Sequence, residues 1–141
     1  RLVAERLEKY GLEKKPGIDE ILAFLHKKNI KAAVATATPI ELTLQHLEKI
    51  GVRNQFDKIV SAKQVKHGKP APDVYLYACE QIGEEPSNCI AVEDSPNGIK
   101  AAYAAGCKPV MVPDLTQPDE EIQRLLYAVV DSLVEIRRLI D

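Results

Sequence analysis

The 141-residue sequence has no tryptophan, only two phenylalanines and five tyrosines, and a formal net charge of −2. With so few aromatic residues, it lacks the basic and aromatic stripe on which nucleotide bases stack. A charge this close to neutral creates no strong field toward nucleic acid or an anionic membrane. The chain also lacks an apolar run of the length, about 18 residues, that a transmembrane helix needs. We therefore expect no nucleic acid and no membrane among its partners.

Cysteine is scarce as well. Cys79, Cys89 and Cys107 are odd in number, and none of them forms a CxxC pair. This excludes a complete disulfide framework and the common spacing of zinc ligands. The pattern favours free, mostly buried thiols in the reducing cytoplasm.

The rest of the composition is that of one ordinary domain. Hydrophobic residues make up 45% of the chain, and a chain of this size buries roughly 70% of its unfolded surface. Apolar residues at helical spacing predict a helix over residues 1–10, and Pro16-Gly17 is then a plausible hinge. Further helices are predicted at 19–28, 39–51, 73–83, 96–106, 119–128 and 133–140, with strands at 30–38, 56–62, 88–94, 108–113 and 129–132. Strands that alternate with helices indicate a parallel sheet covered on both faces.

Polar residues stand where several of these strands end. Thr36 and Thr38 follow one strand, Lys69 lies in the loop after the next, and "NCIAVED" ends on Glu93 and Asp94. Ligands of open parallel sheets bind outside the carboxyl ends of the strands. One crevice would thus hold a hydroxyl, an ammonium and two carboxylates. That set suits phosphoryl transfer, which needs donors and cations around the phosphoryl oxygens, and magnesium, which prefers one or two carboxylates.

Each of these residues also has a purely structural interpretation. A threonine at a strand end is more often a helix cap, and a loop lysine is usually solvated. "HGKP" does not have the spacing of a nucleotide-binding P-loop. The adjacent Glu93 and Asp94 are harder to dismiss, because like charges side by side repel unless a cation lies between them.

The motifs resemble those of the haloacid dehalogenase-like superfamily, and within it the β-phosphoglucomutase-like phosphatases and mutases. "VATAT" resembles the second family motif, "GKPAPDVY" the third and "VEDSPNGIKAAYAAG" the fourth, over a match from about Pro16 to the C-terminus. The resemblance implies a three-layer α/β/α Rossmann-like parallel sheet. It also implies catalytic roles for Lys69 and Thr36, phosphate binding by Thr36, Ala37 and Lys69, and magnesium binding by Glu93 and Asp94. A small phosphorylated metabolite is the implied substrate.

One departure from the family is serious. Its nucleophile is the first aspartate of a DxD motif on an N-terminal strand, and no DxD occurs in these residues. We therefore expect the sheet to lack its first, central strand, with residues 1–15 a remnant of the helical cap and its hinge and residues 16–141 the core domain. The missing N-terminal segment of the same protein is then a possible partner.

Two hypotheses follow. In the first, the complete protein is a magnesium-dependent phosphatase or phosphomutase that works through an aspartyl-phosphate, and this chain alone is inactive. In the second, the chain is a non-catalytic fragment or pseudoenzyme that binds magnesium or a partner. A nucleotide-binding doubly wound domain is disfavoured because no GxGxxG follows a strand. A receiver domain is disfavoured because Thr36 and Lys69 precede the acidic pair.

Overall fold

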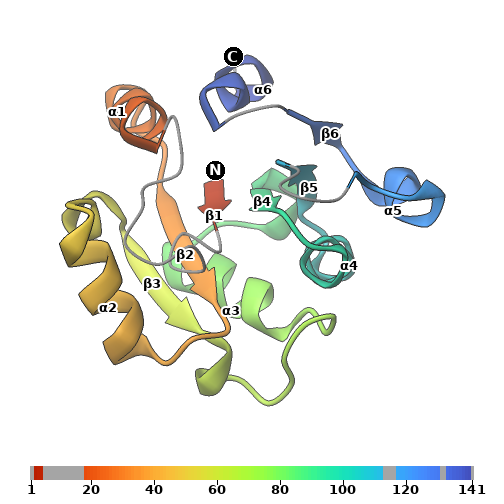
Figure 1. Ribbon diagram of the computed structural model, residues 1–141, viewed down its shortest axis with the longest axis horizontal. Coiled ribbons are helices and arrows are strands. Elements are labelled where there is room, and N and C mark those ends of the chain that lie inside the picture. Colours follow the sequence, from red (N-terminus) through yellow and green to blue (C-terminus); the bar gives the residue numbers. More distant parts are fainter. Residues whose placement is uncertain (1, 5–17, 113–116, 131–132, 141) are drawn as a thin grey trace.

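The computed structural model describes residues 2–4, 18–112, 117–130 and 133–140. Its centre is a six-stranded parallel sheet with the strand order β3-β2-β1-β4-β5-β6 (Figure 1). The strands are β1 Leu2–Ala4, β2 Ala32–Thr36, β3 Lys58–Ser61, β4 Ile90–Glu93, β5 Lys108–Met111 and β6 Ala128–Val129. All their carboxyl ends therefore lie at one edge of the sheet.

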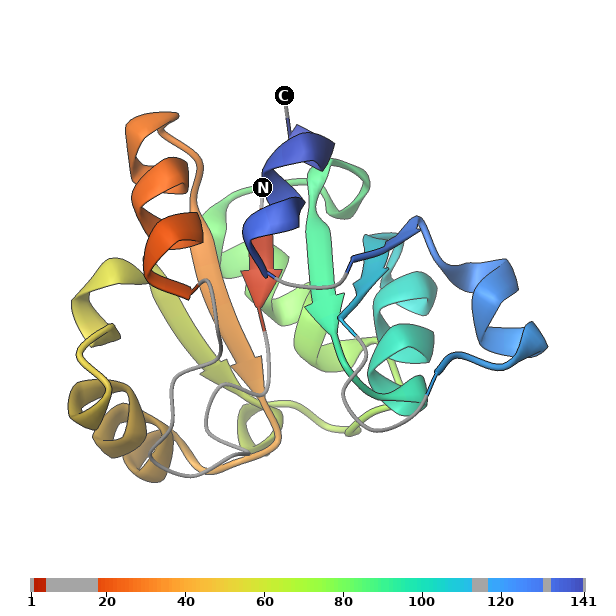
Figure 2. The same cartoon turned by 45° about the horizontal axis from the view of Figure 1, so that its top comes forward.

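Helices cover both faces of this sheet (Figure 2). They are α1 Ile18–Lys27, α2 Ile40–Lys49, α3 Asp73–Ile82, α4 Pro96–Ala105, α5 Glu120–Leu125 and α6 Arg137–Ile140. The described residues also form short 3-10 helices: η2 Arg53–Gln55, η3 Ala62–Gln64, η4 Pro86–Asn88 and η5 Leu133–Ile136. One core packs α1, α2 and η5 on the sheet, and a second packs α3 and α4 on its other face. The three-layer α/β/α fold class is thus confirmed.

Within the described ranges, none of these helices is long and apolar enough to span a bilayer.

The N-terminal residues differ from the prediction. Leu2–Ala4 form β1, a strand paired in parallel with both β2 and β4, instead of part of a helix. The central position that the sequence left empty is therefore occupied by this chain. A three-residue apolar run fits a helix and a buried strand equally well, so periodicity could not decide. Residues 2–4 form a strand because the backbone N–H and C=O groups of β2 and β4 that face each other need hydrogen-bond partners. Residues 2–4 thus belong to the sheet and not to a cap remnant, while Pro16 and Gly17 lie outside the described residues.

The remaining elements follow their local sequence signals. All five residues of β2 are buried, as expected for a central strand covered on both faces. At the start of α4, Ser95 caps the helix by accepting a hydrogen bond from the Gly98 N–H, and Pro96 occupies the first turn. Gly106 ends α4 with φ of 91°. Gly106 is exposed there, unlike the small residues Gly98, Ala101, Ala102 and Ala105 of α4, which are buried.

The three cysteines meet in the core under α3 and α4. All are free and buried, as predicted. The Cys79 sulfur lies 3.5 Å from that of Cys89 and 3.8 Å from that of Cys107. The hydrogen bond with Cys107, together with burial, raises the pKa of Cys79 from 9.0 to about 12. The contact with Cys79, followed by burial, also raises the pKa of Cys89. Both thiols are therefore expected to stay protonated in the folded protein at neutral pH.

This cluster predicts a loss of stability at alkaline pH. Between pH 9 and about 12 the unfolded chain loses the Cys79 proton while the folded chain keeps it. The folded state then binds more protons, so the free energy of unfolding falls as pH rises through this window and is unaffected below it. Urea unfolding at pH 8 and pH 10.5 measures the fall. Cys79→Ala is the control and should lose less stability between the two pH values. Equal losses in the two proteins would contradict the prediction.

Candidate functional site

Glu93, the last residue of β4, is the centre of the site. Its side chain is fully buried, although it ends in a carboxyl group. Its Oε2 accepts a hydrogen bond from Lys69 Nζ at 2.6 Å and another from the Tyr75 hydroxyl, while Ser95 Oγ lies 3.4 Å from its Oε1. Residues Ala91 and Glu93 alternate with Val92 along the strand, which directs Glu93 to the same face as Ala91, toward α3 and α4. The sheet thus places a carboxylate beside α3.

Lys69 reaches this carboxylate from the loop that precedes α3. Its side chain is 10% exposed, and the ammonium lies 5.1 Å from the centre of the Tyr75 ring. The Lys69-Pro70 peptide bond is cis. Asp73 at the start of α3 accepts a hydrogen bond from the His67 N–H at 3.1 Å, which ties the loop to the helix. Lys69 is therefore a partly buried, fixed cation and not a solvated loop lysine.

The Lys69 ammonium changes the interpretation of the two adjacent carboxylates. The sequence indicates that a cation must lie near Glu93 and Asp94, and the structure supplies one in Lys69. Glu93 is thus neutralised by the protein, while Asp94 beyond the strand is only half-buried.

Glu93 and Asp94 are a donor set that fits magnesium. Among the described residues, no group of three or more histidine, cysteine or carboxylate side chains is arranged to hold a metal ion. Zinc sites need three or four such ligands, and calcium takes six to eight oxygens. Magnesium differs, because it retains several waters and is held by one or two carboxylates. Two adjacent carboxylates at a strand end satisfy that requirement.

Thr36 lies at the carboxyl end of β2. It is fully buried, and its Oγ1 accepts a hydrogen bond from the Thr38 N–H at 3.1 Å. The N-cap residue of α2 is Pro39, so Thr36 does not cap that helix. The turn is anchored by Ser61 at the end of β3, whose Oγ donates to the Thr38 carbonyl at 2.7 Å. Ala37 is exposed in this turn. The hydroxyl is therefore held in a fixed position at the sheet edge.

The strand register relates the two halves of the site. Ala4 of β1 is level with Val34 of β2 and with Val92 of β4. Thr36 follows Val34 by two residues and Asp94 follows Val92 by two residues, so they lie on opposite sides of β1. Because adjacent strands are about 4.8 Å apart, β2 and β4 are separated by about 10 Å. The structure thus brings Lys69 and Glu93 into contact and places Thr36 across β1 from them.

The sequence did not single out Tyr75 or Gly98 as a site residue. Tyr75 is fully buried on α3 and donates to Glu93. A Cβ atom added to Gly98 would lie well inside van der Waals contact with the Glu93 carboxylate. Tyr75 does stand in the quoted string "GKPAPDVY", and its polar tip on an otherwise apolar helix face was the available signal. Their contact with Glu93 depends on how α3 and α4 pack, which no local pattern encodes.

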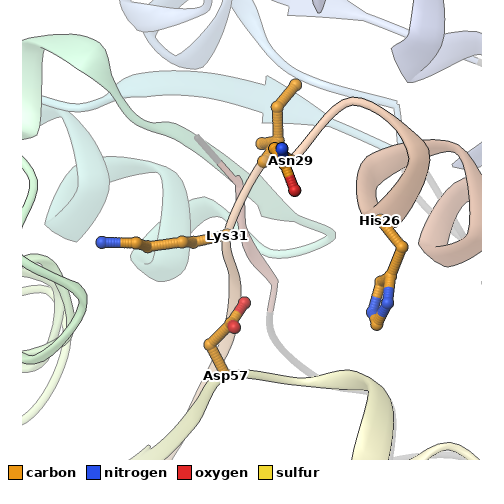
Figure 3. Close-up of a pocket in the computed structure, with 5 residues that line it drawn as sticks. His26, Asn29, Lys31 and Asp57 are labelled. Carbon is orange, nitrogen blue, oxygen red and sulfur yellow. The ribbon is translucent and has the colours of Figure 1, made fainter.

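A pocket lies at the opposite edge of the sheet from the candidate site residues. A cavity of about 270 Å³ is lined by His26, Asn29, Ile30, Lys31 and Asp57 (Figure 3). Its polar groups already bind the protein: Lys31 donates to the Ile82 carbonyl at 2.8 Å, and Asp57 accepts from the Ala32 N–H at 2.8 Å. Figure 3 shows the Lys31 side chain pointing away from His26. The cavity lies at the amino ends of β2 and β3, away from the predicted site residues.

Comparison with known proteins agrees with the motifs. Residues 1–112 match the family of haloacid dehalogenase-like hydrolases. A phosphorylated carbohydrates phosphatase of Thermotoga maritima is 38% identical over 70% of this chain and 46% of its own length. Hexitol phosphatase B of Escherichia coli O157:H7 is 34% identical over 86% of this chain and 54% of its own length. The chain therefore spans about half the length of these curated relatives.

A solved structure shows the same likeness in three dimensions. The β-phosphoglucomutase of Clostridium difficile superimposes with a TM-score of 0.75 at 29% identity, over 87% of this chain and 52% of that one. The parallel sheet, the order of the motifs and these matches lead to one conclusion: the chain belongs to the haloacid dehalogenase-like hydrolase family.

Proposed function

We propose that the complete protein is a magnesium-dependent phosphatase or phosphomutase that acts on a small phosphorylated metabolite. The observation that carries this proposal is the buried pair of Lys69 and Glu93 beside Asp94, at the carboxyl edge of the sheet. A buried ion pair contributes little to stability compared with apolar residues of similar volume. Charged groups that are buried together at a ligand-binding edge are instead typical of functional sites. The relatives named as phosphatases of phosphorylated carbohydrates and hexitols support this class of substrate.

The residues divide the work as follows. Thr36 and the backbone of Ala37 bind phosphoryl oxygens on one side of β1, and Lys69 binds them on the other. An ammonium has three N–H donors, so Lys69 can bind Glu93 and a phosphoryl oxygen together. Glu93 and Asp94 would hold the metal, which would supply positive charge for the phosphoryl oxygens. Glu93 therefore orients both the fixed cation and the metal.

The central strand β1, Leu2–Ala4, carries no carboxylate, so the attacking group of the proposed reaction comes from outside these 141 residues. In the proposed reaction an aspartate carboxylate attacks phosphorus, and the bond from phosphorus to the leaving oxygen breaks. Water or a second substrate then takes the phosphoryl group from the aspartate. The sequence contains no DxD, so we propose that this chain alone is inactive. The reducing cytoplasm is the proposed compartment, since three thiols are free and buried.

Hydrolysis of p-nitrophenyl phosphate, a generic aryl phosphate, tests the proposal. The complete protein should hydrolyse it with magnesium and lose the activity in excess chelator, while the 141-residue chain should be inactive under both conditions. Asp94→Asn should lower turnover of the complete protein by roughly 100-fold, because a ligand of the charge-stabilising metal is lost.

Glu80→Gln is the matched control, since Glu80 is exposed on α3. It should leave turnover unchanged. If the complete protein hydrolyses neither this compound nor any phosphorylated sugar, the enzyme proposal is wrong. The alternative, a non-catalytic protein that binds magnesium or a partner, would then hold.

A further inference from the structure

Tyr75 contacts both charged residues of the site without being charged itself. Its hydroxyl donates to Glu93 Oε2, and its ring lies beneath the Lys69 ammonium at 5.1 Å. The residue is fully buried. One side chain of α3 therefore touches the loop before α3 and the end of β4, which are the two elements that supply the ion pair.

Packing alone does not account for a tyrosine here. The α3 residues around it that pack on the sheet are apolar: Val74, Ala78, Cys79 and Ile82. A phenylalanine would fill the same space and keep the ring under Lys69. It would also avoid the cost of burying a hydroxyl, which is recovered only if the hydroxyl finds a partner. The partner of the Tyr75 hydroxyl is Glu93 Oε2, which also accepts a hydrogen bond from Lys69.

Two donors on one oxygen fix how the carboxylate is turned. Lys69 and Tyr75 approach Glu93 Oε2 from different elements, so the carboxylate cannot rotate without breaking at least one of these bonds. The partner described for Oε1 is Ser95 Oγ, at the longer distance of 3.4 Å. The two oxygens of the Glu93 carboxylate therefore differ. Oε2 accepts two hydrogen bonds from the protein, and Oε1 has a longer contact with Ser95.

We propose that Tyr75 is a positioning residue that orients Glu93 so that Oε2 holds Lys69 and Oε1 serves the metal. This inference rests on the proposed function, in which Glu93 and Asp94 hold magnesium. Groups that hydrogen-bond to metal ligands fix the orientation of those ligands, and removing such a group typically weakens metal binding roughly 10-fold to 100-fold. Without the hydroxyl, Lys69 alone would leave Glu93 free to turn and to share both oxygens.

Calorimetric titration of the complete protein with magnesium tests this role. Tyr75→Phe removes the hydroxyl and keeps the ring, so we expect the magnesium Kd to rise roughly 10-fold with little change in thermal midpoint. Tyr77→Phe is the matched control, because Tyr77 lies on the same helix and is half-buried. It should leave the Kd unchanged. Tyr75→Leu also removes the ring under Lys69 and should weaken magnesium binding at least as much as Tyr75→Phe.

The outcomes separate this inference from the function on which it rests. If Tyr75→Phe binds magnesium within two-fold of the parent while Asp94→Asn loses binding, the tyrosine only packs and the positioning role is wrong. If Asp94→Asn binds magnesium like the parent, the metal site itself is misplaced and both proposals fall. A weaker affinity in Tyr75→Phe, with a parent-like value in Tyr77→Phe, supports the positioning role.

Discussion

Replacing Gly98 with alanine is expected to destabilise the protein by about 2–3 kcal/mol, although alanine is the better helix former. Gly98 lies in the first turn of α4, and helix propensity alone predicts a gain of about 1 kcal/mol for this change. The added methyl group, however, would overlap the Glu93 carboxylate. Glu93 would have to leave Lys69 and Tyr75, or α4 would have to move away from the sheet. The predicted effect therefore has the opposite sign to the propensity.

Urea unfolding of the two proteins measures the difference, and the magnesium Kd should rise in the same variant. Gly68→Ala is the control, because a methyl group at Gly68 would meet no atom within 4 Å. Its stability should change by no more than about 0.5 kcal/mol. A double-mutant cycle isolates the cause: with Glu93→Ala already in place, Gly98→Ala should cost little. An equal cost in both backgrounds would show that the collision with Glu93 is not the reason.

Most elements from residue 18 onward could be predicted because each carries its own local signal. Near the C-terminus the predictions were less accurate: the helix expected at 119–128 is α5, Glu120–Leu125, with Ala128 in β6, and the helix expected at 133–140 is η5 followed by α6. The helix at 39–51 has proline at its start and glycine just after its end, and the structure gives α2 as Ile40–Lys49. The strand at 30–38 is a continuous apolar run, and β2 is buried along its whole length. Parallel pairing then brings the residues after these strands to one edge. The sequence thus indicated which residues come together at this edge, where the candidate site lies.

The contacts within the site could not be predicted in the same way. Lys69 and Glu93 are 24 residues apart, and they meet only because the loop before α3 folds over the end of β4. The acidic pair suggested a nearby cation, and magnesium was the expected one. The structure adds Lys69 in direct contact with Glu93, so that pair already has a cation from the protein. Tertiary packing, and not spacing along the chain, determines which cation pairs with a buried carboxylate.

The position of β1 shows the same limit. Leu2 and Val3 fit a helical pattern, and no nearby residue marks them as a strand. They form a strand because they pair with β2 on one side and β4 on the other, strands that begin 30 and 88 residues later in the sequence. Secondary structure that depends on a distant partner in this way is invisible to local periodicity.

Replacing Lys69 with methionine is expected to have the largest effect of all. The change keeps most of the side-chain volume but leaves the Glu93 carboxylate buried without its ammonium. Removing one partner of a buried ion pair costs about 3–5 kcal/mol, because the other charge stays desolvated. Turnover of the complete protein should fall by about 100-fold or more, since the cation proposed to bind the phosphoryl oxygens is gone.

A second substitution separates the two roles of Lys69. In Lys69→Met with Glu93→Gln, the buried pair is neutral, and glutamine can still accept the Tyr75 hydrogen bond, so most of the lost stability should return. Turnover should stay low, because no cation replaces the ammonium. Lys66→Met, at an exposed lysine of the same loop, should match the parent in both measurements. Near-normal turnover in Lys69→Met would remove Lys69 from the proposed mechanism. A double variant no more stable than the single one would show that the buried charge is not what destabilises it.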